Sequence, residues 1–185
     1  MQDFNVFLND DPNFNFQPRQ LKIANKEYTV SQAGRSVAGE MVAVEEAIYH
    51  ATPWPKEAFE IEMDQRNRLY LQVLENDSGR LIAFAGLSIN FYRKDGHITN
   101  IGVHPAYQGQ GIGSCLLRIM IQASLRLGME TMSLEVKRAN LRAQNLYTDL
   151  GFKTVRMRPH YYQDDGDDAY EMTLSLTTMK GIEHE

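Results

Sequence analysis

The segment from Asn100 to Leu127 constrains the fold of this chain more than any other. It reads as the end of a strand, a short turn at His104-Pro105, a glycine-rich loop and then a long amphipathic helix. Glycine permits backbone angles that are closed to other residues, and it lets the main chain approach a ligand closely. Because the loop leads straight into a helix, its N–H groups lie at the positive end of the helix dipole. The segment therefore predicts a seat for an anionic group such as a phosphate.

The spacing of the glycines separates this loop from two other phosphate-binding loops. Gln108, Gly111 and Gly113 form the pattern Q-x-x-G-x-G. A dinucleotide-binding fold would need G-x-G-x-x-G, with an acidic residue about 20 residues further on. A P-loop would need Gly-Lys followed by Ser or Thr, and no such sequence follows here. Taken alone, the loop is also compatible with a tight strand-to-helix turn that binds nothing.

The composition is typical of a soluble globular protein. The chain has 185 residues, of which 43% are hydrophobic, and a net charge of −5. This charge argues against general binding of nucleic acid through a basic surface. The sequence has no apolar run of the length of a membrane span and does not begin like a signal peptide, so we expect a cytoplasmic protein without a membrane partner.

Neither cysteine nor histidine suggests a reactive centre of its own. Cys115 is the one cysteine, and its apolar helix position is more typical of a core residue than of a nucleophile. The five histidines lack the spacing of metal ligands, so no metal is expected.

The chain reads as a single α/β (α+β) domain over residues 25–185, preceded by a loosely ordered extension over residues 1–24 that contains Phe4, Phe7, Phe14 and Phe16. Alternating or apolar runs predict strands at 26–31, 69–74, 81–91, 97–103, 131–136, 152–158 and 169–176. Helical spacing of apolar residues predicts helices at 34–50, 56–65, 112–127 and 140–150. Between the first two helices lies Pro53-Trp54-Pro55, either a structural turn with a packed Trp or a border of a substrate groove.

A second motif, L-E-V-K-R-A-N-L-R-A-Q-N-L-Y-T-D-L-G-F, runs from Leu134 to Phe152. Together with the Q-x-x-G-x-G loop, its N-x-x-A-x-x-L-Y-x-x-x-G-F pattern resembles the GNAT acetyltransferase family. Within that family the chain is most similar to the ribosomal-protein alanine N-acetyltransferases of the RimI type, over about residues 28–176. The resemblance implies the GNAT fold, a mixed and mostly antiparallel central sheet flanked by helices, and an enzyme that uses acetyl-CoA as co-substrate.

The resemblance also assigns roles to residues of both motifs. Glu135 would be the general base, acting directly or through a water, with burial raising its pKa toward the working range. Tyr147 would be the general acid, or the hydrogen-bond donor to the leaving thiolate. The loop N–H groups would hold the CoA pyrophosphate, and the preceding strand would offer backbone groups to the pantetheine arm. The implied CoA-binding residues are Ile101, Gly102, Val103, Gln108, Gly109, Gln110, Gly111, Ile112, Gly113, Ser114 and Asn140.

The expected acetyl acceptor is a protein or peptide N-terminus, with the N-terminal alanine of a small-subunit ribosomal protein as the leading candidate. An α-amine has a reference pKa of about 7.7–8.0 and a lysine one near 10.4, so the α-amine asks less of a base. Two alternatives stay open. One is the same chemistry on a small amine such as a polyamine or an aminoglycoside, and the other is a CoA-binding module without turnover.

Several residues near the second motif also allow a structural interpretation. Glu135 could be an ion-paired strand carboxylate, with Lys137 or Arg138 as its partner, and Asn140 could be only a helix cap. Tyr161-Tyr162 could pack in a hairpin or line a peptide groove. The acidic stretch 164–168 is either a solvated loop or an attractant for a basic target.

Overall fold

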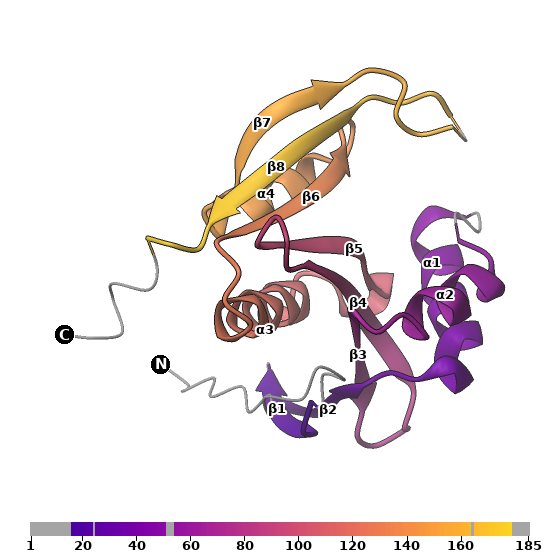
Figure 1. Cartoon of the computed structure of the whole chain (residues 1–185). Helices are drawn as coiled ribbons and strands as arrows, with labels where there is room; N and C mark the ends of the chain where they lie inside the picture. Colours follow the sequence, from indigo (N-terminus) through magenta and orange to yellow (C-terminus); the bar gives the residue numbers. More distant parts are fainter. Residues whose placement is uncertain (1–15, 24, 51–53, 164, 179–185) are drawn as a thin grey trace. The chain divides into compact units, whose positions relative to one another are not determined.

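The structure is a computed structural model that describes residues 16–23, 25–50, 54–163 and 165–178 (Figure 1). Phe4, Phe7, Phe14, Pro53 and Asp164 of the sequence analysis lie outside these residues. The chain forms two compact units. The first comprises Met1–Ser88 and Thr99–Ala123, and the second comprises Ile89–Ile98 and Ser124–Glu185. No helix of the described residues is long and apolar enough to cross a membrane.

The first unit is built on an antiparallel run of strands. Its strands are β1 (Arg19–Ile23), β2 (Lys26–Gln32), β3 (Arg68–Glu75) and β4 (Leu81–Asn90), paired in that order. Its helices are η1 (Arg35–Val37), α1 (Ala38–Tyr49), α2 (Lys56–Met63), η2 (Pro105–Tyr107) and most of α3 (Ile112–Arg126).

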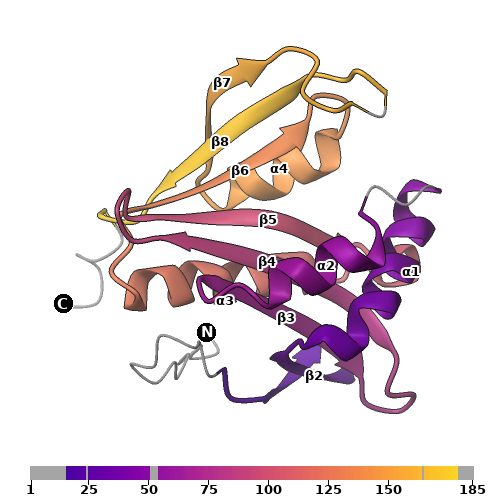
Figure 2. The ribbon, with the colours of Figure 1, turned by 45° about the vertical axis from the view of Figure 1, so that its right-hand side comes forward.

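A shared apolar cluster holds α1 and α2 against these strands, and Figure 2 shows both helices lying over them. Phe59 of α2 is its centre, because its ring lies 5.4 Å from that of Phe84 and 5.6 Å from that of Trp54. Burying an aromatic ring of this kind contributes about 2–3 kcal/mol. Trp54 therefore packs against α2, and packing of this side chain was one of the two interpretations of the residue.

Two glycines let neighbouring strands of the first unit pack closely. A Cβ on Gly86 would lie 2.5 Å from both Thr99 Oγ1 and Tyr70 Cζ. A Cβ on Gly102 would lie 2.8 Å from Phe84 Cε1. The absence of a Cβ at Gly86 and Gly102 therefore allows these close approaches.

Glu45 is buried in α1, and the Trp54 backbone N–H donates a hydrogen bond of 3.2 Å to its Oε2. Burial raises the pKa of this carboxyl from 4.5 to about 7. Because the folded state binds the proton more tightly than the unfolded chain, the associated stability is present below the unfolded pKa. It is lost as the pH rises through the folded pKa.

We therefore expect Glu45→Gln, which mimics the protonated carboxyl, to raise the free energy of unfolding at pH 8 by about 1–3 kcal/mol. At pH 4 we expect little change. Chemical denaturation at the two pH values measures this. Glu46→Gln, at the exposed neighbouring position, is the control and should show no such pH dependence. An equal effect of Glu45→Gln at both pH values would contradict the prediction.

The second unit contains α4 (Leu141–Asp149), the last three strands and the first residues of the strand Asp95–Val103, whose later residues belong to the first unit. The first residues of β5 (Asp95–Val103) pair in parallel with β6 (Thr131–Lys137). Strand β8 (Ala169–Ser175) is antiparallel to β6 on one side and to β7 (Lys153–Arg158) on the other. The sheet pairings are thus mixed and mostly antiparallel, as the sequence predicted.

The predicted elements are present, with small shifts at their ends, and the structure adds one strand. Strand β1 lies in the segment that the sequence analysis assigned to a loosely ordered extension, and it pairs with β2 along its whole length. Gly128 and Gly151, which follow α3 and α4, have φ values of +76° and +95°, as is common where a helix ends at glycine.

Candidate active site

The glycine-rich loop joins the end of β5 to α3 and is held by its own side chains. His104 caps η2, because its Nδ1 accepts a hydrogen bond of 3.2 Å from the Ala106 N–H. The Gln108 side chain turns inward and donates a hydrogen bond of 2.9 Å from Nε2 to the Val103 carbonyl. The first residue of the predicted motif therefore positions the loop against its strand.

Two glycines of the loop adopt conformations that favour glycine, whereas Gly113, the last glycine of the motif, lies inside α3. Gly109 and Gly111 have φ values of +79° and +92°, in the region that disfavours residues with a Cβ. A Cβ on Gly111 would meet no atom within 4 Å, so the backbone here borders open space. Helix α3 begins at Ile112, and the first N–H groups of any α-helix lack an acceptor inside the helix. These features suit a pyrophosphate.

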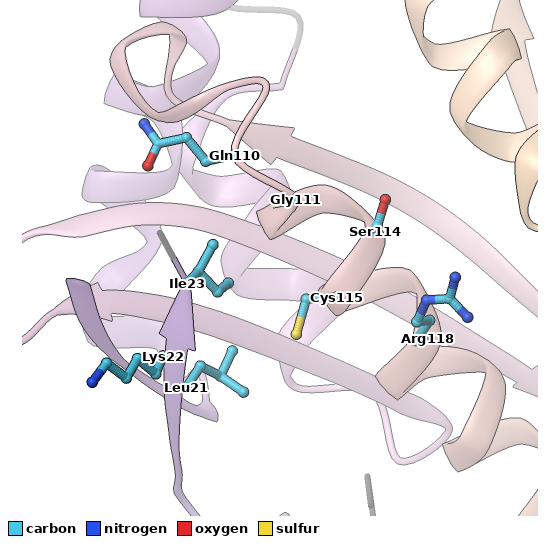
Figure 3. Close-up of a pocket in the computed structure, with 8 residues that line it drawn as sticks. All are labelled: Leu21, Lys22, Ile23, Gln110, Gly111, Ser114, Cys115 and Arg118. Atoms are coloured by element: carbon cyan, nitrogen blue, oxygen red, sulfur yellow. The ribbon is translucent and has the colours of Figure 1, made fainter. Parts of the chain in front are cut away.

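A pocket of about 260 Å³ lies beside the loop, between β1 and the start of α3 (Figure 3). Three of its residues were predicted to bind CoA, namely Gln110, Gly111 and Ser114. Two basic residues, Lys22 and Arg118, also line it. Sequence reasoning missed both, although the spacing of four between Ser114 and Arg118 already indicated one helix face.

Cys115 also lines this pocket, and its sulfur lies on the side of α3 that faces β1 (Figure 3). Only 8% of the residue is exposed. Burial raises the pKa of its thiol to about 11, so the thiol is uncharged at neutral pH. A thiol in that state is a poor nucleophile, which agrees with the interpretation as a core residue.

Changing the conformation at Gly111 should weaken the anion seat. The resemblance implies that this loop holds the pyrophosphate of acetyl-CoA. On that basis we expect Gly111→Ala to raise the KM for acetyl-CoA about tenfold or more, because a residue with a Cβ disfavours the φ of +92° that aims the loop N–H groups. Gly79→Ala is the matched control, since Gly79 has a φ of +67° and the same open surroundings, in the β3–β4 turn. Steady-state kinetics would contradict the prediction if both variants kept the KM of the wild type.

Glu135 occupies the face of β6 opposite to the buried Met132, Leu134 and Val136. Its Oε2 lies 3.2 Å from His97 Nε2, and its Oε1 lies 3.6 Å from Arg158 Nη2. The side chain is 13% exposed.

The hydrogen bond from His97 is the largest influence on the Glu135 carboxyl and lowers its pKa, and the nearby His97 and Arg158 charges act in the same direction. Burial acts in the opposite direction and is outweighed. Burial thus raises this pKa, as expected, but the net pKa is lowered because the hydrogen bond from His97 outweighs burial. Glu135 is an ionised and comparatively weak base at neutral pH.

Lys137 and Arg138, which the sequence left open as ion-pair partners of Glu135, form ion pairs with other carboxylates. Lys137 Nζ lies 2.7 Å from Asp165 Oδ2, and Arg138 Nη1 lies 3.3 Å from Asp168 Oδ2. Part of the acidic stretch is therefore neutralised by basic residues of the same unit. This favours a structural role for these two aspartates over attraction of a basic target.

Asn140 and Tyr147 lie at the start and near the end of α4. Asn140 is the N-cap, because its Oδ1 accepts a hydrogen bond of 3.1 Å from the Ala143 N–H. Tyr147 is 5% exposed, and its ring packs edge-on against Phe152 at 5.9 Å.

The paired tyrosines after β7 stack on basic side chains of the second unit. The Arg158 guanidinium lies 5.5 Å from the Tyr161 ring, and Lys137 Nζ lies 4.8 Å from the Tyr162 ring. Burial, and then the negative charge of Glu135, raise the pKa of Tyr161. Tyr161, which is 40% exposed, therefore lies close to the candidate base.

The loop thus belongs to the first unit, and Glu135, Asn140 and Tyr147 belong to the second. A loop that can hold a pyrophosphate and an ionised carboxylate that can accept a proton are the parts that an acyl transfer from a CoA thioester requires.

Comparison with known proteins identifies the class of enzyme. The family model described as "Acetyltransferase (GNAT) family" matches residues 39–152. The chain therefore belongs to the GNAT family and is an N-acetyltransferase.

Among its relatives is the [ribosomal protein bS18]-alanine N-acetyltransferase of Escherichia coli K12. It is 34% identical over 130 residues, which span 69% of this chain and 84% of that protein. The N-alpha-acetyltransferase RimI of Mycobacterium tuberculosis is 38% identical over 65% of this chain and 74% of its own length.

Solved structures show the same fold. The crystal structure of the E. coli ribosomal-protein-S18-alanine N-acetyltransferase matches with a TM-score of 0.72 and 32% identity, over 80% of this chain and 94% of that one. A Salmonella typhimurium protein solved with its cofactor acetyl-CoA matches with a TM-score of 0.66. At 22% identity it supports the fold alone.

Proposed function

We propose that this enzyme transfers an acetyl group from acetyl-CoA to the α-amine of a protein N-terminus, with the N-terminal alanine of ribosomal protein bS18 as the leading substrate. The relative named as a [ribosomal protein bS18]-alanine N-acetyltransferase supports this substrate, and the relative named as an N-alpha-acetyltransferase supports the α-amine. The observation that carries the proposal in this chain is the Glu135 carboxylate, which is held ionised beside His97.

The weakness of this base supports an α-amine over a lysine. Deprotonating a lysine rather than an α-amine costs about 3.5 kcal/mol more, from the difference between their reference pKa values. A carboxylate with a lowered pKa is poorly matched to that extra cost. A fraction of the α-amine is already neutral at pH 7, so a weak base suffices to remove its proton.

The residues of the chain divide the work as follows. The loop N–H groups around Gly111 and the start of α3 hold the pyrophosphate, and the Lys22 and Arg118 side chains add positive charge beside it. Acetyl-CoA, when bound, supplies the acetyl group as a thioester. Glu135 accepts the proton of the substrate amine, directly or through a water. Tyr147 donates a hydrogen bond to the sulfur as negative charge develops there.

Mass spectrometry of acetyl-CoA reactions with three acceptors tests the proposal. The first is an arginine-rich peptide with a free N-terminal alanine and no lysine. The second has the same sequence with a blocked N-terminus and one internal lysine. The third is spermidine. We expect acetylation of the first peptide, and reaction only with the second or with spermidine would overturn the proposal.

A further inference from the structure

A continuous chain of polar groups runs along the parallel pairing of β5 and β6. The register places Asp95 opposite Thr131 and His97 opposite Ser133. Ser133 Oγ lies 2.5 Å from Asp95 Oδ2 and 3.0 Å from His97 Nδ1. The other ring nitrogen, His97 Nε2, lies 3.2 Å from Glu135 Oε2. We call Asp95, Ser133, His97 and Glu135 the polar chain.

The polar chain contains three short gaps, and each needs one hydrogen between its two heavy atoms. The gaps are Asp95–Ser133, Ser133–His97 and His97–Glu135. The hydroxyl supplies one hydrogen, a neutral imidazole supplies a second, and ionised carboxylates supply none. Without a third hydrogen, two acceptor atoms face each other across one gap. The arrangement is therefore complete only when the polar chain binds one extra proton.

The hydrogen bonds at the Asp95 end of the polar chain determine which nitrogen of His97 exchanges the extra proton. Ser133 donates its hydrogen to the Asp95 carboxylate, whose other oxygen accepts one from Thr131 Oγ1 at 2.6 Å. The Ser133 oxygen then remains as the acceptor for the Nδ1–H of His97. This fixes the hydrogen on Nδ1 and leaves Nε2, which faces Glu135, as the nitrogen that gains and loses a proton.

We propose that the polar chain stores the proton removed from the substrate amine, with Asp95 and Ser133 as positioning residues that direct His97 Nε2 toward Glu135. This rests on the proposed function, in which Glu135 is the base. An N–H bond of the substrate ammonium breaks, and an O–H bond forms on Glu135. That bond breaks in turn as an N–H bond forms on His97 Nε2. The amine is left neutral, the carboxylate is regenerated, and the imidazolium later returns the proton to water.

The lowered pKa of Glu135 belongs to the state in which His97 Nε2 carries a proton and donates it to the carboxylate. When Nε2 has no proton, that donor is absent, so the carboxylate is a stronger base and its proton has a second acceptor at hydrogen-bond distance. The other groups that face Glu135 do not provide one. Arg158 of β7 is a cation that binds Glu171 of β8 at 2.8 Å, a shorter contact than its 3.6 Å to Glu135. Tyr161 is held in its neutral form by its raised pKa.

The test is the pH dependence of kcat/KM for wild type, Ser133→Ala and Asp95→Asn, with the N-terminal alanine peptide as substrate. The substrate amine titrates identically in all three, so a difference reports the enzyme. Both variants remove a group that stabilises the extra proton of the polar chain. We therefore expect the acidic limb of the kcat/KM profile to move to lower pH by about one unit. We expect kcat at pH 8 to fall about tenfold, with the KM for acetyl-CoA unchanged.

Glu130→Gln is the control, because its exposed ion pair with Lys94 lies just before β6 and outside the polar chain. This variant should show the same acidic limb of the kcat/KM profile and the same kcat at pH 8 as the wild type. Coincident limbs in wild type, Ser133→Ala and Asp95→Asn would overturn the proposal.

Nitrogen-15 NMR of the histidine side chains gives a readout that needs no turnover. As the pH is raised, we expect His97 of the wild type to lose the proton of Nε2 and keep that of Nδ1. In Ser133→Ala the Nδ1 proton loses its acceptor, and we expect the neutral ring to carry its hydrogen on Nε2. Loss of the Nδ1 proton in the wild type would overturn the proposal. A wild type that shows the expected NMR behaviour but does not acetylate the peptide would refute the proposed function instead.

Discussion

Replacing Glu135 by Gln is expected to lower kcat by about 10²–10⁴-fold, the usual contribution of a general base. The amide has nearly the same shape, so the contacts of β6 should survive, but it cannot accept a proton. The KM for acetyl-CoA should change little, because the loop that binds the pyrophosphate is untouched. Steady-state rates on the N-terminal alanine peptide at pH 8 measure both quantities.

The pH profile of the wild type provides a further check on Glu135. Because the pKa of its carboxyl is lowered, the carboxylate stays ionised through the neutral range. We therefore expect activity lost between pH 8 and 6 to come from the substrate amine or from another group of the polar chain, and not from protonation of Glu135. A Glu135→Gln enzyme with the kcat of the wild type would show that another group takes the proton.

Replacing Tyr147 by Phe is expected to lower kcat by about 10²–10³-fold, the range for removal of one hydrogen-bond donor to developing negative charge. The substitution keeps the ring, which packs edge-on against Phe152 at 5.9 Å, and removes only the hydroxyl. We therefore expect kcat to fall while the packing of the ring against Phe152 is kept.

Tyr92→Phe makes the same chemical change at a residue that is 97% exposed in the turn between β4 and β5, and it should behave like the wild type. A leaving group that is a better anion than the CoA thiolate should reduce the loss in Tyr147→Phe, because its charge needs less stabilisation. An undiminished kcat in Tyr147→Phe would assign the residue to packing alone.

Local sequence patterns predicted most of the helices and strands. Apolar spacing and the turn residues located the helices and the strands from β2 onward, and the motifs located the loop, Glu135 and Tyr147. Strand β1 was missed because its five residues lie in a polar segment, and only Leu21 among them is buried. Its strand character comes from pairing with β2, which is a tertiary property.

The surroundings of Glu135 were less accessible from the sequence, because its partners lie on other strands. His97 comes from β5 and Arg158 from β7, and the sheet register that brings them to Glu135 is not written in any local pattern. Proximity along the chain suggested Lys137 and Arg138, but the loop before β8 supplies closer carboxylates to both. The net direction of the Glu135 pKa shift was mispredicted for the same reason. The alternation of apolar residues along β6 indicated that Glu135 is partly buried, but no local pattern indicated the hydrogen bond from His97, which outweighs burial.

The most direct test of the central claim uses one peptide that carries both a free N-terminal alanine and an internal lysine. After reaction with acetyl-CoA and the wild-type enzyme, fragmentation in the mass spectrometer locates the acetyl group. We expect it on the α-amine, with no acetylated lysine above the level of an enzyme-free control. Acetylation of the lysine with a free α-amine would contradict Nα-acetylation, and with it the assignment of bS18 as the substrate.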